Sequence, residues 1–203
     1  MVRTLSKRLP IFEAAVAVFS EKGFARATME EVARRAGIAK GTLYYNYRSK
    51  KALFLSLIEE GIERLENAVK RETARKEDTF GRLEALIGAQ LSFFEEYRDY
   101  CKILLSEVWG LGTKWEEQVE RLRSGYIRII RDLIKKGQAE GVIRKNLEVD
   151  TAAMAVFGAV AVAALNAFVF ETQYRYDGIL QTLKNLLLTG IQEPTGTVVA
   201  SEK

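Results

Sequence analysis

Residues 28–54 read TMEEVARRAGIAKGTLYYNYRSKKALF, and they decide how the rest of the chain is interpreted. Their pattern predicts two short helices, over about 28–36 and 40–47, separated by a tight turn that carries Gly37. A further helix is expected to begin after Ser49. Two short helices joined by a glycine-containing turn are typical of a helix-turn-helix.

The individual residues suit these positions. Thr28 and Glu31 have the spacing of a capping box, in which a hydroxyl and a carboxylate bond the free amides of a helix start. Ala33 is small enough to let the two helices touch, and Gly37 accepts a left-handed turn conformation. Leu43 pins the second helix onto the first. The second helix keeps an outward face suited to DNA grooves and phosphates, which consists of Lys40, Thr42, Tyr45 and Asn46, flanked by Tyr44 and Lys50.

The segment AGIAKGTLYYNYRSKKALF resembles the DNA-binding motif of the TetR family of bacterial transcriptional regulators. The upstream segment IFEAAVAVFSEKGFARATMEEVA resembles that family's first helix and the start of its second, so the match covers roughly residues 8–55. Beyond it, only the number and spacing of helices resemble the family. The resemblance implies a three-helix DNA-binding domain over residues 1–50 and a helical effector-binding and dimerisation domain over 51–192. The tail over 193–203 is expected to be disordered.

The same resemblance implies which side chains meet DNA. Gly41 is expected to let the backbone lie close to a phosphate. The implied base-facing residues are Lys40, Thr42, Tyr45 and Asn46. The implied phosphate contacts are Thr28, Tyr44 and Lys50.

Several of these residues also have a simpler interpretation. Thr28 could only cap its helix, Tyr44 could partly pack, and Lys50 could be solvated. Ala39 stands where the family commonly has a capping serine, and the loss of such a cap typically costs about 1 kcal/mol. The second helix is therefore expected to depend on packing or on DNA for its order.

Composition favours an all-α fold of about nine helices. The 203 residues include only two prolines, and no segment has the alternating pattern of a strand. Residues 1–50 hold ten Lys/Arg and four Asp/Glu, whereas residues 51–203 hold 21 and 23. A polyanion is therefore expected to meet the N-terminal domain alone. Residues 1–9 are expected to form a basic arm, either disordered or reaching along DNA, and the first helix to run from near Pro10 to Gly23.

Apolar residues at helical spacing predict the helices of the second domain. The first of them, over about 51–75, is long enough to connect the two domains and to act as a lever between them. Gly110–Gly112 are expected to break the chain between two helices, and Thr113 with Glu116 to form a second capping box. The predicted helices cover about 51–75, 79–97 and 100–109, a segment ending near 141, then 151–170 and 177–189.

Residues 151–170, TAAMAVFGAVAVAALNAFVF, contain no charged residue. Their length alone is compatible with a membrane span. Their many alanines, together with Gly158 and Asn166, favour a buried helix, and a helix that is apolar on every side must be covered on every side. The last two helices are therefore expected to pair with those of a second subunit. A membrane-associated or structural helical protein is the alternative that rests on this segment.

Aromatic and polar residues of the second domain are candidates for an effector site. A lipophilic or fatty-acyl effector is expected, although most of these aromatics could instead belong to the core. Gln90 and Glu107 are further polar candidates. The residues predicted to bind the effector are Phe94, Tyr97, Trp109, Arg123, Tyr126 and Asn166.

Several classes of function are disfavoured. The chain has no histidine, and its adjacent carboxylates would point apart on a helix, so no enzyme, cofactor or metal site is expected. The single Cys101 is expected to be buried, and the N-terminus lacks a signal-peptide core, which is typical of a cytoplasmic protein. The resemblance to the TetR family implies a ligand-responsive repressor that binds a palindromic operator in double-stranded DNA as a homodimer and is released by its effector.

Overall fold

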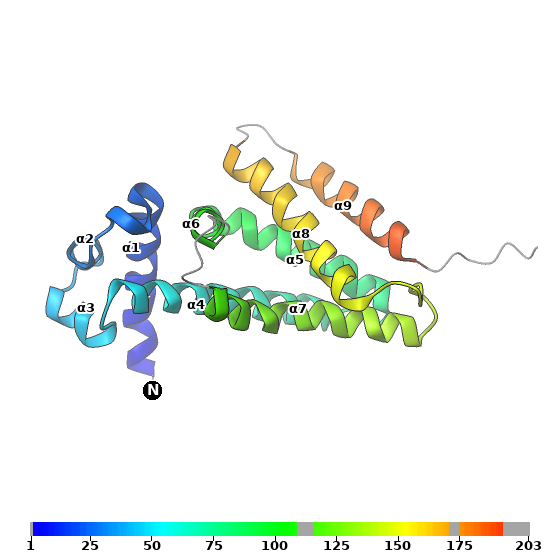
Figure 1. The fold of residues 1–203 in the computed structure, drawn as a ribbon, viewed down its shortest axis with the longest axis horizontal. Helices are drawn as coiled ribbons and strands as arrows, with labels where there is room; N and C mark the ends of the chain where they lie inside the picture. Colours follow the sequence, from blue (N-terminus) through cyan, green and yellow to red (C-terminus); the bar gives the residue numbers. More distant parts are fainter. Residues whose placement is uncertain (1, 109–115, 171–174, 193–203) are drawn as a thin grey trace, which may run out of the picture. The chain divides into compact units, whose positions relative to one another are not determined.

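The computed structural model describes the backbone of residues 2–108, 116–170 and 175–192 (Figure 1). These residues form nine α-helices and one π-helical segment, and they contain no strand, which confirms the expected all-α class. The side chains of residues 2–9, 104–108, 116–123 and 169–170 are outside the described set. The chain divides into two compact units, of which the first holds residues 1–66 and 94–124 and the second holds 67–93 and 125–203.

Helix α1 spans Val2–Arg26, so the expected start near Pro10 is wrong, and the segment expected as an arm is helical from Val2 onward. Pro10 lies inside the helix, where its missing amide removes one bond of the ladder without ending it. The expected stop at Gly23 is confirmed as a break, because Gly23 adopts φ 74° and ψ 159°.

Helices α2, Met29–Arg35, and α3, Lys40–Asn46, form the predicted helix-turn-helix. Thr28 and Glu31 make the expected capping box at the start of α2. Gly37 has φ 66°, a left-handed conformation that favours glycine. Leu43 is completely buried, so the side of α3 that carries it faces the interior of the first unit.

An aromatic cluster joins α1 to α4, which spans Lys50–Thr73. The ring centroids of Phe24 and Phe54 lie 4.9 Å apart, and Phe19 meets Phe54 edge-on at 5.8 Å. Ser49 caps α4, because its Oγ accepts the amide of Ala52 at 3.1 Å. Helices α1–α3 and the start of α4, called the head below, are therefore a packed body in which α3 packs on α2, α2 packs on α1 and the aromatic cluster joins α1 to α4.

Helix α6, Arg98–Val108, packs on α1 within this first unit. Helix α4 contributes residues to both units, and so does helix α5, Thr79–Glu96. The predicted functional boundary between residues 50 and 51 lies at the start of α4 and stays a prediction.

The second unit is built around α5 together with α7, Glu116–Ala139, α8, Val149–Leu165, and α9, Tyr176–Ile191. Most of its core side chains come from α5, α7 and α8, and Val69 of α4, Ile143 before α8 and Leu183 of α9 complete them. Two ion pairs tie its surface, since Lys184 of α9 lies 2.9 Å from Glu84 and Arg131 of α7 lies 2.5 Å from Asp150. The most deeply buried aliphatic residues of this unit are Val69, Leu83, Leu86, Ile87, Leu91, Ile130, Ile134, Ile143, Ala153 and Val160.

Helix α8 buries one face and exposes the other. A single chain therefore does not cover this helix on every side, and the second subunit expected from the sequence would have to cover the exposed face. Ala153, Val156 and Val160 are buried, whereas Val162 is 55% exposed. The segment Val149–Phe168 is long and apolar enough to cross a membrane by length and composition, and 39% of its most apolar window is buried. One such helix is weak evidence for a membrane protein, because the core helix of a soluble protein meets the same criteria.

Some predictions fall outside the described residues. These are the break at Gly110–Gly112, the capping box that begins at Thr113, the side of the effector site that contains Trp109, and the tail over 193–203. The π-helical segment Asn166–Phe170 continues α8 and was not part of the predicted pattern.

The cap of α8 gives a prediction on acid stability. Glu148 accepts the amides of Thr151 at 2.6 Å and Asp150 at 2.9 Å. A hydrogen bond from the Thr151 side chain, followed by these two amide bonds, lowers the pKa of Glu148 from 4.5 to about 2. Its stabilisation is therefore present above about pH 4.5 and is lost as the pH falls toward 2.

We expect Glu148→Gln to lower the urea midpoint at about pH 6, and the difference from wild type to shrink at about pH 3.5. Circular dichroism at both pH values measures it. A difference that stays constant with pH would show that the ionised carboxylate does not stabilise the cap.

Candidate nucleic-acid interface and effector core

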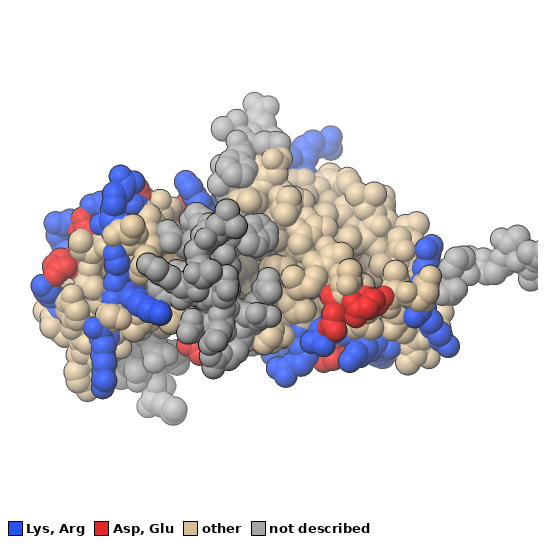
Figure 2. Space-filling view, viewed as in Figure 1, with Lys and Arg blue, Asp and Glu red and all other residues tan. Residues whose placement is uncertain are grey.

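The outward face of α3 is exposed. Tyr45 is 90% exposed and Tyr44 is 39% exposed, which is unusual for aromatic side chains in a folded domain. A Cβ added at Gly41 would meet no heavy atom within 4 Å, so the backbone there is open to a close approach. Lysine and arginine side chains gather over α1–α3 (Figure 2). Lys40, Thr42 and Asn46 are exposed as well.

The start of α3 lacks a side-chain cap. Ala39 occupies the cap position in an extended conformation and makes no side-chain hydrogen bond, as its residue type predicts. Lys40 is the first helical residue, and its ammonium forms an ion pair with Glu30 of α2. The same ammonium lies 5.7 Å from the ring centroid of Tyr44. Lys40 is thus presented on the surface but already has an anionic partner within the chain.

Asn46 is turned back toward its own helix. Its Nδ2 donates to the carbonyl of Thr42 at 2.8 Å. The amide must leave this bond to read a base edge with both donor and acceptor, as an asparagine–adenine pair requires. Thr42 keeps its hydroxyl on the exposed face.

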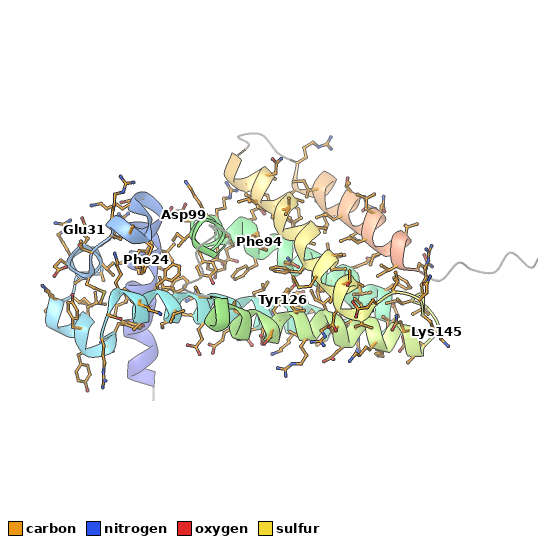
Figure 3. The ribbon with its side chains drawn as sticks, in the orientation of Figure 1. Phe24, Glu31, Phe94, Asp99, Tyr126 and Lys145 are labelled. Carbon is orange, nitrogen blue, oxygen red and sulfur yellow. The ribbon has the colours of Figure 1, made fainter. Side chains whose placement is uncertain are left out.

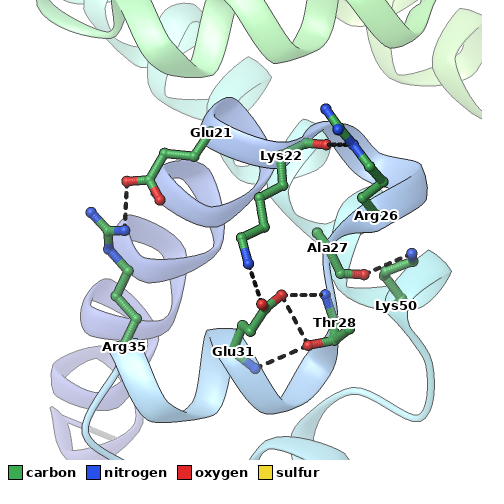
Figure 4. A network of polar contacts seen from close by, with 8 residues as sticks. All are labelled: Glu21, Lys22, Arg26, Ala27, Thr28, Glu31, Arg35 and Lys50. Atoms are coloured by element: carbon green, nitrogen blue, oxygen red, sulfur yellow. Dashed lines mark hydrogen bonds and ion pairs between the residues drawn. The ribbon is translucent and has the colours of Figure 1, made fainter.

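The start of α2 is held by a charged network around Glu31 (Figure 4). Glu31 accepts the amide and the hydroxyl of Thr28, and Lys22 of α1 forms an ion pair with its carboxylate. Hydrogen bonds from Lys22 and Thr28 lower the pKa of Glu31 to about 2. The Thr28 hydroxyl therefore takes part in the cap of α2. In the DNA-free chain Thr28 acts as a helix cap, and its predicted phosphate contact stays a prediction.

Lys50 holds the chain between α1 and α2. Its Nζ donates to the carbonyls of Ala25 at 2.9 Å and Ala27 at 2.8 Å, and it lies 4.7 Å from the ring centroid of Phe24. A lysine ammonium has three donors, so two of them stabilise the α1–α2 connection. This internal role accompanies the predicted phosphate contact, which stays a prediction.

Helix α6 is locked against α4 by a ring over a glycine. Tyr100 is 4% exposed, and its hydroxyl donates to the carbonyl of Ile58 at 3.1 Å. A Cβ added at Gly61 would lie 2.1 Å from the Tyr100 ring, so the ring occupies the space that a larger residue would fill. Phe12 of α1 stacks on the same ring at 5.9 Å. Burial raises the pKa of Tyr100, so its hydroxyl stays protonated.

A second contact joins the same three helices. The guanidinium of Arg64 on α4 lies 4.4 Å from the Phe12 ring centroid and 5.7 Å from that of Tyr97, and it pairs with Glu60 at 2.6 Å. Ser20 of α1 donates to Asp99 at 3.3 Å. These contacts make α6 part of the same packed body as the DNA-binding head.

The second unit has a buried polar group at its centre. Tyr126 of α7 is labelled in Figure 3. Its hydroxyl donates to Gln90 Oε1 at 2.8 Å, and Gln90 Nε2 donates to the Phe157 carbonyl at 3.1 Å. Gln90 is completely buried, and Tyr126 is 1% exposed. Burial raises the pKa of Tyr126, so it remains a neutral donor. The group links α5, α7 and α8 through hydrogen bonds in otherwise apolar surroundings.

The residues predicted to bind an effector lie in different parts of the fold. Phe94 and Tyr97 belong to the first compact unit, and Tyr126 and Asn166 belong to the second. Phe94 and Tyr126 are buried, whereas Asn166 is exposed at the end of α8. Trp109 and the side chain of Arg123 are outside the described residues.

Residues 11–57 match the family of bacterial regulatory proteins of the tetR type, and residues 76–164 match the C-terminal domain of tetracyclin-repressor-like proteins. The chain belongs to the TetR family. Its helix-turn-helix is therefore the DNA-binding element of a transcriptional regulator, as the motif predicts.

Relatives and solved structures with TetR-type folds span nearly the whole chain. A fatty acid metabolism regulator of Bacillus subtilis is 24% identical over 91% of this chain and 95% of the relative. The fatty acid degradation regulator FadR from Bacillus halodurans superposes with a TM-score of 0.84 at 22% identity, covering 91% of this chain and 95% of that one. FadR from Bacillus subtilis, solved in complex with stearoyl-CoA, gives a TM-score of 0.81 at 21% identity and covers 91% and 99%.

Two features of this TetR-family chain escaped the sequence reasoning. The first is the pairing of Glu30 with Lys40, which depends on how α2 and α3 cross. The second is the close approach of Tyr100 to Gly61, although a glycine in the interior of a helix was a usable signal for it. Glycine is unfavourable within a helix, so its presence there often reflects a packed neighbour.

The ring over Gly61 gives a prediction on stability. Gly61→Ala forces the Tyr100 ring out of its place, and overpacking of this kind costs about 1–3 kcal/mol. The control is Gly88→Ala in α5, where a Cβ would make only an ordinary contact with Leu180 at 3.9 Å, so the change should be neutral or slightly stabilising. Urea unfolding of the two variants measures both effects. Equal stabilities would contradict the proposed close packing of α6 on α4.

Proposed function

We propose that this TetR-family chain is a repressor that binds a palindromic operator as a dimer and leaves it when a fatty-acyl effector binds. The observation that carries the DNA-binding part is the exposed face of α3, a short helix whose opposite face is fixed by the fully buried Leu43. Such a helix presents its side chains to a major groove in one orientation. The setting is cytoplasmic, where such a protein meets DNA.

The proposed interface keeps the residues that the motif predicts. Tyr45, which is 90% exposed, is the side chain most available for a base or sugar contact. Gly41 offers an open backbone for a phosphate. The proposed base-facing residues are Lys40, Thr42 and Asn46. The proposed contacts to DNA phosphates are Thr28, Tyr44 and Lys50. Lys50 would use its third donor, because the other two bond the carbonyls of Ala25 and Ala27.

The proposed dimer uses the exposed faces of α8 and α9. Val162 is 55% exposed, Met154 is 38% exposed, and Leu186 of α9 is 70% exposed. Ala155 and Gly158 lie on the same side of α8 and would let a partner helix approach closely. Apolar residues exposed in this pattern support pairing of these helices with their copies from a second subunit. Asn166 lies at the end of this face and fits a hydrogen bond across it.

The fatty-acyl effector is supported by two observations. The Bacillus subtilis relative, similar over nearly its whole length, is a fatty acid metabolism regulator, and the FadR structure from that organism holds stearoyl-CoA. The second unit has a largely apolar core between α5, α7 and α8, into which Gln90 and Tyr126 bring a hydrogen-bonded polar pair. An apolar site with few polar groups is typical of lipophilic ligands. Phe94, Tyr97, Trp109, Arg123, Tyr126 and Asn166 remain the proposed contacts.

Release is proposed to be a population shift. An effector favours one arrangement of the helices by its differential affinity and by no more than that. Helix α6 is bound to the head by Tyr100, and α4 is continuous from the head into the second unit. A displacement of either helix would therefore change the placement of α3.

Tyr45→Ala tests the interface. The side chain is 90% exposed, so its removal should change the free energy of unfolding by less than about 0.5 kcal/mol. Loss of a base contact should weaken operator binding by about tenfold or more. Fluorescence anisotropy with a labelled duplex measures the affinity, with Glu13→Gln on α1 as a control that should bind no more weakly than wild type. Undiminished binding by Tyr45→Ala would remove Tyr45 from the interface.

Stearoyl-CoA tests the effector. We expect micromolar stearoyl-CoA to release the wild-type protein from its operator, whereas coenzyme A alone should not, because the apolar core selects the acyl chain. The measurement is a competition titration followed by anisotropy. If stearoyl-CoA, like coenzyme A, leaves operator binding unchanged, the effector is not a fatty-acyl compound.

A further inference from the structure

The ammonium of Lys40 is already paired in the DNA-free chain. It contacts the carboxylate of Glu30, and the two side chains are 59% and 50% exposed. The hydrogen bond from Lys40 lowers the pKa of Glu30, and the same bond raises the pKa of Lys40. Both groups therefore stay charged over the physiological range, and the pair faces solvent rather than the core.

The position of this pair in α3 gives it a local role. Helix α3 has no side-chain cap at Ala39 and begins with a cation, although cations are unfavourable at the positive end of a helix. The carboxylate of Glu30 supplies a negative charge beside that cation. An exposed ion pair of this kind is weak, so DNA can displace it at a small cost.

Glu30 lies in the first turn of α2, two residues after Thr28. In a helix-turn-helix the first helix crosses the DNA backbone while the second enters the groove. A carboxylate in that turn, once its lysine has moved to DNA, is left near phosphates and repels them. The pair therefore has to open for Lys40 to bind DNA, and the opened state carries an added repulsion.

We propose that Glu30 is an autoinhibitory residue that competes with DNA for Lys40 and holds the DNA affinity of the head below its maximum. This inference rests on the proposed interface, in which Lys40 contacts DNA. The competition acts on every DNA sequence, because it is set within the protein. A lower affinity for the operator also means that an effector of limited differential affinity is sufficient for release.

The matched variants are Glu30→Gln and Glu21→Gln. Each removes one negative charge and releases one cation, since Arg35 of α2 lies 2.6 Å from Glu21. Of these two glutamates, only Glu30 is paired with a residue of α3. Neither change touches the capping box of Thr28 and Glu31, so both variants should keep the wild-type circular dichroism spectrum and unfold in one transition close to that of wild type.

We expect Glu30→Gln to bind a duplex of unrelated sequence about two- to fivefold more tightly at about 0.1 M salt, the range for one exposed ion pair. The slope of log affinity against log salt should steepen by up to about one, because one more lysine becomes available to phosphates. Glu21→Gln should tighten binding by a clearly smaller factor. Fluorescence anisotropy over a salt series measures all of these quantities.

Lys40→Gln separates this inference from the proposed interface. It should weaken DNA binding, and Glu30→Gln should then have no further effect in the Lys40→Gln background. Weaker or equal binding by Glu30→Gln would overturn the inference while the interface stands. An equal gain in the Lys40→Gln background would overturn it as well, because Glu30 would then act only through net charge. Unchanged binding by Lys40→Gln would overturn both the inference and the role of Lys40, but not DNA binding by the chain.

Discussion

The constraint on which the structure depends is the length of its recognition helix. Helix α3 has seven residues and no side-chain cap, and an isolated helix of that size is not stable in water. Its order has to come from its neighbours, through the burial of Leu43, the left-handed turn at Gly37 and the capped start of α2. The aromatic cluster around Phe54 then holds the supporting helices together. The exposed face of α3 can be presented to DNA in one orientation because the burial of Leu43 fixes the opposite face.

The same packed body includes α6, which lies in the part of the chain that matches the C-terminal domain of tetracyclin-repressor-like proteins. Helix α6 meets α1 and α4 through Tyr100, whose ring lies over Gly61 and whose hydroxyl bonds the α4 backbone. Packed interfaces of this kind change between discrete arrangements rather than deforming gradually. In the proposed mechanism the head is controlled through these buried contacts, whereas its proposed contacts with DNA are exposed and charged. The Glu30–Lys40 pair belongs to the second kind, and its cost is small enough to adjust affinity without disturbing the fold.

Sequence reasoning was most successful where one local pattern determines the structure. The capping box at Thr28, the glycine turn and the missing cap at Ala39 depend on neighbouring residues, and all three are confirmed. The expected start of α1 near Pro10 is wrong, because a proline lowers helix stability without excluding a helix on both of its sides. The internal contacts of Lys50 and the partner of Lys40 depend on how separate helices cross, which no local spacing contains. For the same reason, the sequence suggested Gln90 and Tyr126 as separate pocket candidates but not their hydrogen bond.

The central claim is that two copies of this head, joined through α8 and α9, read DNA as a symmetric pair. Selection of bound fragments from a pool of random duplexes by the purified full-length protein tests it most directly, because the selected sequences report symmetry and spacing together. The account predicts an enriched palindrome whose half-sites are centred about 10 base pairs, or a multiple of that, apart on one face of the duplex. Enrichment of a single unpaired half-site, or of no sequence at all, would contradict it.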